Sequence, residues 1–158
     1  DACREVLDYV TLDELLAQSD IVSLHVPYFP GQNDKMANAE FFSKMKDGAI
    51  FLNTARGELQ DNEAILAALK SGKLDGYGTD VFANETAFFF KKLGSAAEIS
   101  DPTVRELVQM YPKVLVTPHI GSNTDEALAN MIEYSMDNFN EILTTGTTKN
   151  LIALPEAK

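Results

Sequence analysis

The chain has 158 residues, of which 24 are acidic and 13 are basic, so its formal net charge is −11. This length suits one compact domain with a sizeable core, and the composition is that of a folded protein. Nucleic acid is disfavoured as a partner, because an acidic surface repels the phosphate backbone. The single cysteine, Cys3, and the two histidines provide neither an internal disulfide nor a zinc cluster, so we expect no metal site and a reducing, cytoplasmic location. No apolar run reaches the roughly 20 residues needed to cross a bilayer, and we expect neither a cleavable leader nor a membrane partner.

Four short segments rich in β-branched and apolar residues are predicted as strands. They are Ile21–Val26, Ala49–Thr54, Gly76–Phe82 and Val114–Thr117. Their apolar residues run almost without interruption, a pattern typical of strands that are covered on both faces of a parallel sheet.

Helices are predicted around these strands, because residues that cap helices stand before amphipathic segments. The predicted caps are Thr11 (a capping box with Glu14), Asn38, Asp61, Asp101 and Asn123 (a capping box with Glu126), and the longest helix covers about 125–144. Strands that alternate with helices imply parallel β-α units with right-handed crossovers, and therefore an α/β fold.

The residues that follow each strand are the candidates for function, because ligands bind beyond the carboxyl ends of the strands in an open parallel sheet. They include two histidines, an arginine and two acids: His25, Arg56, Asp80, Glu85 and His119. Each has a plain alternative when taken singly. His119 could simply end a strand, Glu85 could be a solvated loop acid, and Arg56 could form a surface ion pair.

Taken together, these side chains suit the reduction of a 2-oxo acid. The planar guanidinium of Arg56 matches a carboxylate with two parallel hydrogen bonds, and the imidazole of His119 can give a proton to the carbonyl oxygen. Glu85 could bind the other ring nitrogen of His119 and favour the imidazolium form. A nicotinamide cofactor would supply the hydride. A serine-hydrolase interpretation lacks a Gly-x-Ser-x-Gly elbow, and hydrolysis by a metal lacks a ligand cluster.

Three ordered motifs resemble the NAD-dependent D-2-hydroxyacid dehydrogenases, and the resemblance runs from about Tyr9 to Gly146. The motifs are Asn53–Gly57 followed by Asp61, Ser71–Leu74 leading into Gly78–Phe82, and Thr117–Gly121. The long insertion between Glu85 and His119 is most similar to the D-lactate and D-2-hydroxyisocaproate dehydrogenase branch. By contrast, the segment 120–122 looks closer to the phosphoglycerate dehydrogenase branch, so the resemblance leaves the substrate open.

The resemblance implies a Rossmann-like parallel sheet that is the carboxyl-terminal half of a doubly wound dinucleotide-binding domain. Residues 1–124 would be the second half of an NAD-binding domain, and 125–158 a long helix and tail that lead back to a missing substrate domain. In the catalytic site, Arg56 would bind the substrate carboxylate, His119 would be the general acid and base, and Glu85 would assist His119. The residues implied for NAD are His25, Val26, Pro27, Asn33, Thr54, Ala55, Arg56 and Asp80, with a structural role as the alternative for His25.

The sequence also departs from the family pattern, because it has neither the phosphate-binding Gly-x-Gly-x-x-Gly turn nor the acidic residue that holds the ribose. We therefore expect about half of an enzyme, inactive or nearly so on its own, whose intact homodimer reduces a 2-oxo acid, foremost pyruvate to D-lactate.

The segment Ile21–Val26 would present an open edge for a partner chain, another copy or crystal packing to cover. Phe82 and Phe88–Phe90 would either line a pocket for the substrate side chain or pack inside. The alternatives in function are an NAD-sensing protein-interaction module on the same scaffold and an inactive truncation product.

Overall fold

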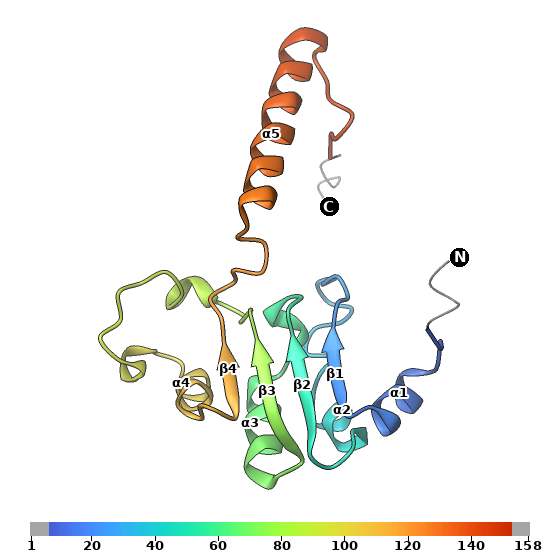
Figure 1. Cartoon of the computed structure of the whole chain (residues 1–158), viewed down its shortest axis with the longest axis vertical. Helices are drawn as coiled ribbons and strands as arrows, with labels where there is room; N and C mark the ends of the chain where they lie inside the picture. Colours follow the sequence, from blue (N-terminus) through green and yellow to red (C-terminus); the bar gives the residue numbers. More distant parts are fainter. Residues whose placement is uncertain (1–6, 153–158) are drawn as a thin grey trace. The chain divides into compact units, whose positions relative to one another are not determined.

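The structure, a computed structural model, describes residues 7–152 (Figure 1). The chain divides into two compact units, with the division between His119 and Ile120. The elements of the first unit are, in chain order, α1 (Leu12–Gln18), β1 (Ile21–Leu24), α2 (Ala39–Lys44), β2 (Ala49–Asn53), α3 (Asn62–Ser71), β3 (Leu74–Thr79), α4 (Pro102–Gln109) and β4 (Val114–Val116). The second unit contains α5 (Asp125–Thr145).

The four strands form one parallel sheet in the order β1-β2-β3-β4, as Figure 1 shows. Leu24 lies opposite Asn53, Asn53 opposite Thr79, and Thr79 opposite Val116. The strands therefore end at the same level, and the loops that follow them meet at one edge of the sheet. The predicted α/β fold with a parallel sheet is confirmed.

The core lies between one face of the sheet and the helices that connect the strands. The rings of Phe42 in α2 and Phe51 in β2 meet edge to face at a centroid distance of 5.1 Å, and Phe51 stacks on Tyr77 of β3 at 5.9 Å. Other buried residues of this core include Val22, Leu24, Ile65, Leu69, Leu74, Leu107 and Val114. Aromatic contacts thus link neighbouring strands to the helix layer.

The prediction that both faces of the sheet are covered is wrong for the part of the chain that the structure describes. Ile21 is 57% exposed, and Leu115 is 59% exposed. Burial alternates along β1 and β2, so one face is packed and the other is open. The apolar runs concealed this alternation because several exposed positions, namely Ile21, Ile50 and Leu115, are themselves apolar.

Helix caps follow the sequence closely. Thr11 and Glu14 form the predicted capping box, and Asp61 accepts hydrogen bonds at the start of α3, which ends at Gly72 in the left-handed conformation (φ 79°). Asn38 and Asp101 cap α2 and α4 as predicted.

The cap predicted at Asn123 is wrong. The Oγ1 atom of Thr124 accepts from the backbone N–H of Ala127 at 3.1 Å, so α5 begins one residue later than a cap at Asn123 requires. The N–H of Asn123 instead donates to the carbonyl of Ile120 at 2.9 Å, which places Asn123 in the preceding turn.

All four predicted strands end early, β2 and β4 by one residue and β1 and β3 by two or more. β1 stops at Leu24, and β3 runs over Leu74–Thr79 rather than to Phe82. The Oγ1 atom of Thr79 accepts from the backbone N–H of Val81 and donates to its carbonyl at 2.7 Å. These bonds replace the sheet ladder, so the chain turns after Thr79.

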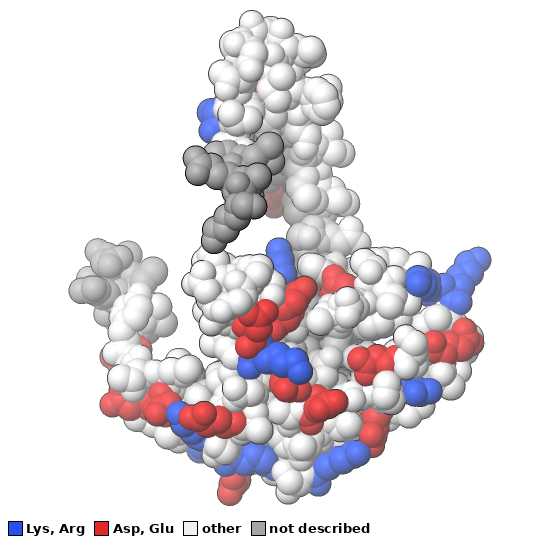
Figure 2. All heavy atoms as spheres, turned by 180° about the vertical axis from the view of Figure 1, so that it is seen from behind, with Lys and Arg blue, Asp and Glu red and all other residues white. Residues whose placement is uncertain are grey.

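Ion pairs on the surface of the first unit join neighbouring elements. Lys44 of α2 contacts Asp13 of α1 at 2.9 Å, and Lys70 of α3 contacts Glu106 of α4 at 2.7 Å. Figure 2 shows basic side chains among the acidic ones on this unit. Because these pairs are exposed, they contribute little to stability.

The helix of the second unit, α5, is amphipathic and has no buried residue. Its exposed apolar residues include Met131, Ile132, Phe139 and Leu143. Gly146 ends it in the left-handed conformation (φ 78°). Within residues 7–152, no helix combines the length and the apolar character that a membrane span needs.

Candidate active site

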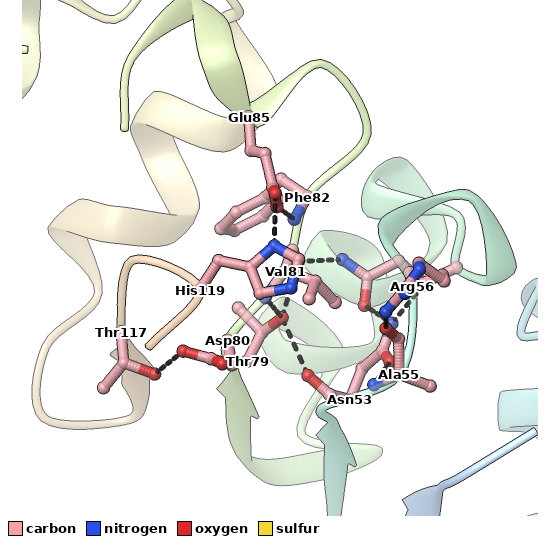
Figure 3. A network of polar contacts seen from close by, with 11 residues as sticks. Asn53, Ala55, Arg56, Thr79, Asp80, Val81, Phe82, Glu85, Thr117 and His119 are labelled. Carbon is pink, nitrogen blue, oxygen red and sulfur yellow. Dashed lines mark hydrogen bonds and ion pairs between the residues drawn. The ribbon is translucent and has the colours of Figure 1, made fainter. Parts of the chain in front are cut away.

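The three predicted catalytic residues line one cavity of about 320 Å³ at the carboxyl edge of the sheet. Arg56 follows β2, Glu85 follows β3 and His119 follows β4, so the parallel topology brings them together from distant parts of the sequence (Figure 3). The other lining residues are Gly57, Glu58, Val81, Phe82, Asn84 and Thr86.

The imidazole of His119 is oriented by Glu85. The Nδ1 atom of His119 pairs with Oε1 of Glu85, and the second carboxylate oxygen, Oε2, accepts from the backbone N–H of Phe82 at 3.0 Å (Figure 3). Both oxygens of Glu85 are thus engaged, which fixes the carboxylate and, through it, the ring. His119 has a left-handed backbone (φ 52°), which is uncommon for a residue with a side chain and clusters at functional sites.

The loop that carries Arg56 is held by Asn53, the last residue of β2. The Oδ1 atom of Asn53 accepts from the N–H of Ala55 at 3.0 Å, and its Nδ2 atom donates to the carbonyl of Arg56 at 3.0 Å. The Nη1 atom of Arg56 donates to the carbonyl of Ala55 at 2.7 Å. Among the residues that the structure describes, Arg56 forms no ion pair, so the surface-pair alternative is not the arrangement found.

Gly57 brings the loop of Arg56 against the turn that carries Glu85. A Cβ atom at this position would lie 2.0 Å from the carbonyl carbon of Phe82 and 2.1 Å from the nitrogen of Ala83. The two backbones pack so closely that only glycine fits between them.

A second cavity of about 520 Å³ lies along the same edge and also reaches Arg56. Its lining residues are His25, Val26, Pro27, Tyr28, Thr54, Ala55 and Arg56. These include all the residues predicted for the cofactor except Asn33 and Asp80.

Asn33 and Asp80 lie outside the lining of both cavities. The Oδ1 atom of Asn33 accepts from Phe29 N–H at 2.7 Å, and its Nδ2 atom donates to the Pro27 carbonyl at 2.9 Å, so Asn33 holds the loop after β1. Asp80 is buried and accepts from the hydroxyl of Thr117 at 2.6 Å.

The aromatic loop mostly packs inside. Phe89 is buried, and the rings of Phe88 and Phe89 lie 5.6 Å and 6.1 Å from that of Phe82. Phe90 is 80% exposed. Only Phe82 of this group lines the cavity of His119.

Sequence reasoning missed Tyr28, Gln60 and Thr117. Tyr28 directly follows the predicted segment 25–27 and could have been included by adjacency. Gln60 and Thr117 act through hydrogen bonds between side chains, and nothing in the sequence shows which partner each one meets.

In the described range 7–152, no group of three or more histidines, cysteines and acids could hold a metal ion.

Comparison with known proteins gives consistent matches. The family model described as D-isomer specific 2-hydroxyacid dehydrogenase, NAD binding domain, matches residues 1–121. An aromatic 2-oxoacid reductase of Clostridium sporogenes is 38% identical over 150 residues, which make up 95% of this chain and 44% of that protein. A D-lactate dehydrogenase of Lactiplantibacillus plantarum is 44% identical over 136 residues, or 86% of this chain and 40% of that protein.

Solved structures agree with these relatives. The crystal structure of a D-lactate dehydrogenase with NAD+ from Lactobacillus jensenii has a TM-score of 0.84 at 33% identity, covering 98% of this chain and 45% of that chain. This chain therefore spans less than half the length of each of these proteins.

Proposed function

This chain belongs to the D-isomer specific 2-hydroxyacid dehydrogenase family, as its motifs predicted, and from that premise we propose that it is the carboxyl-terminal half of an NAD-dependent enzyme that interconverts a 2-oxo acid and a D-2-hydroxy acid. The main observation that supports the proposal is that Arg56, Glu85 and His119 line the same cavity. A cation, a proton donor and an acid that orients the donor are the groups that this reaction requires beside the hydride source.

Arg56 binds the substrate in this proposal. Its guanidinium offers two parallel N–H groups to the carboxylate of a 2-oxo acid, and its positive charge also polarises the neighbouring carbonyl. Asn53 accepts from the N–H of Ala55 and donates to the carbonyl of Arg56, so the backbone from which the Arg56 side chain extends is held in place.

His119 moves the proton. Because Nδ1 pairs with Glu85, Nε2 is the ring atom that faces the reacting oxygen. During reduction, the imidazolium gives its Nε2 proton to the carbonyl oxygen while the carbonyl carbon gains a hydride. In the reverse direction, the neutral ring takes the hydroxyl proton back.

The cavity of about 520 Å³ suits part of a dinucleotide, because it combines the apolar walls of Val26 and Pro27 with the polar side chains of His25 and Thr54. These residues, with Ala55, would hold NAD, and Asp80 would accept a hydrogen bond from the carboxamide. Asn33 would act on the cofactor by holding the loop 27–33. When bound, the nicotinamide supplies or accepts the hydride.

The substrate pair proposed is pyruvate and D-lactate. The relative named D-lactate dehydrogenase supports it. The relative named aromatic 2-oxoacid reductase makes phenylpyruvate the first competitor to test.

The organisation of the intact enzyme follows from the same proposal. Residues 1–124 belong to the NAD-binding domain, and 125–158 lead toward the substrate domain. The apolar face of α5 and the open edge at β1 are surfaces for the rest of the enzyme and for a homodimer to cover. We propose a cytoplasmic location on the grounds of the single cysteine.

The test is turnover by the full-length protein. It should oxidise NADH in the presence of pyruvate and yield the D isomer of lactate. Replacing His119 by glutamine should lower kcat by roughly 100- to 10,000-fold, the usual contribution of a general acid. Glu63→Gln, an exposed change on α3, is the matched control and should leave kcat unchanged.

Failure of the full-length protein to oxidise NADH with any 2-oxo acid would refute the proposal. The 158-residue chain alone should show no turnover, because its sequence lacks the glycine-rich phosphate turn. Turnover by this chain alone would refute the assignment of the remaining cofactor contacts to the rest of the enzyme.

A further inference from the structure

Gln60 is a buried polar residue that the catalytic steps above do not use. It follows the 3-10 turn Gly57–Leu59, and only 3% of its surface is exposed. Its side-chain amide lies where two loops meet, one carrying Arg56 and the other carrying Glu85.

On one side, Gln60 fixes the loop of Arg56 through Asn53. Its Oε1 atom accepts from Nδ2 of Asn53 at 2.8 Å. This bond selects the orientation in which Oδ1 of Asn53 accepts from the N–H of Ala55 and Nδ2 donates to the carbonyl of Arg56. Without Gln60, one N–H of the Asn53 amide would lose its partner.

On the other side, Gln60 reaches the turn that leads to Glu85. Its Nε2 atom donates to the carbonyl of Val81 at 3.5 Å and to Oδ1 of Asn62 at 3.0 Å. The carbonyl of Val81 also accepts from Thr79 at 2.7 Å. The next residue, Phe82, donates its N–H to the Glu85 carboxylate that pairs with His119 (Figure 3).

The Gln60 amide lies in a buried region, where the loss of a hydrogen bond has a large effect. Gln60 and the neighbouring Tyr77 are both buried, so they lie in a region of low dielectric, and the same burial raises the pKa of the Tyr77 phenol well above its usual range. In such a region a fully satisfied polar network is rigid, and a partly satisfied one is costly. An apolar side chain of similar size would fill the same space, so packing alone does not call for an amide here.

We propose that Gln60 is a positioning residue for the reduction of the 2-oxo acid. Through Asn53 it sets Arg56, and through Val81 it sets Glu85 and His119, so that the carboxylate and the carbonyl of one substrate meet both groups at once. This inference rests on the proposed function, and Gln60 itself does not touch the substrate.

The experiment replaces Gln60 by methionine in the full-length protein and measures kcat and KM for pyruvate. Both loops lose their common anchor, and a misplacement on the order of 1 Å lowers rates by up to about 100-fold. We expect kcat/KM to fall roughly 10- to 100-fold, with a lower kcat and a higher KM. Leu107→Ala, a buried change on α4, is the structural control and should lower the thermal midpoint while leaving kcat/KM unchanged.

A double-mutant cycle separates positioning from general destabilisation. If Gln60 acts through the catalytic groups, Gln60→Met should cost much less in an Arg56→Met background than in the unsubstituted enzyme. Equal fold-changes in the two backgrounds would overturn the inference, and so would an unchanged kcat/KM in Gln60→Met.

If Gln60→Met does not fold, a milder variant still tests the inference. Asn62→Ala removes one partner of the Gln60 amide at a half-buried position, and we expect about a 3-fold lower kcat/KM. An unchanged value would overturn the inference. Failure of the unsubstituted enzyme to turn over any 2-oxo acid would instead refute the proposed function and this inference with it, so the two failures are distinguishable.

Discussion

Replacing Gly57 by alanine should push apart the two loops that carry the proposed catalytic residues Arg56 and Glu85. The new Cβ atom would lie 2.0 Å from the carbonyl carbon of Phe82, whereas ordinary contact begins at 3.4 Å. The two backbones must therefore separate by roughly 1.4 Å, and no rotamer change can relieve the clash because the atoms on the Phe82 side belong to the main chain.

The expected losses follow from this displacement. Overpacking of this kind costs about 1–3 kcal/mol of stability. Because Arg56 moves relative to Glu85 and His119, kcat/KM for the 2-oxo acid should fall by about 100-fold. The assay is steady-state oxidation of NADH by the full-length protein, with thermal unfolding measured on the same preparation.

Gly94→Ala is the control for this change. Its Cβ atom would meet only the exposed, flexible side chain of Glu98, so both kcat/KM and the thermal midpoint should stay unchanged. If Gly57→Ala keeps the activity of the unsubstituted enzyme, the proposed contact between the two loops does not control the geometry of the site.

Further predictions concern the cofactor side, a surface pair and the core. Thr117→Val removes the hydrogen bond that holds Asp80, the residue proposed to accept from the carboxamide of NAD, and should weaken NADH binding by about 3-fold in a fluorescence titration. Unchanged binding would show that Thr117 does not position Asp80 for the cofactor. The hydrogen bond from Tyr28 lowers the pKa of Asp34 and raises that of Tyr28, so its stabilisation should be present between about pH 4 and pH 10. This stabilisation should be lost as the pH falls through the lowered pKa of Asp34 or rises through the raised pKa of Tyr28. The free energy of unfolding, measured in urea, should therefore differ between Tyr28→Phe and the unsubstituted protein at pH 7, and the two values should converge at acidic pH. A constant difference would contradict this assignment. Phe51→Ala opens a cavity at the centre of the core and should cost about 3–5 kcal/mol in urea unfolding, and a loss below about 1 kcal/mol would show that the core closes around the gap.

Much of the fold could be predicted from local sequence signals. Caps such as Asp61 and the stop at Gly72 act within a few residues, so they can be identified without tertiary information. The end of β3 could not be predicted, because it depends on the bond from the Thr79 hydroxyl to Val81 rather than on the apolar character of the segment. The open face of the sheet was missed because Ile21 and Leu115 are apolar although exposed.

The shared location of the proposed catalytic residues could be predicted because parallel strands end at one edge. That rule alone brings Arg56, Glu85 and His119 together, and the cavity they share agrees with it. The rule does not identify the residues that hold these three side chains in position. The role of Gln60 depends on side-chain amide orientations, and the close fit at Gly57 depends on the approach of two distant backbones, neither of which has a sequence pattern.

The most direct measurement is a crystal structure of the full-length protein with NADH and oxamate, an unreactive analogue of pyruvate. The oxamate carboxylate should form two hydrogen bonds with Arg56, and its amide oxygen should lie within hydrogen-bond distance of Nε2 of His119. Oxamate bound away from Arg56, or with Nε2 of His119 turned from it, would contradict the proposed roles of these two residues.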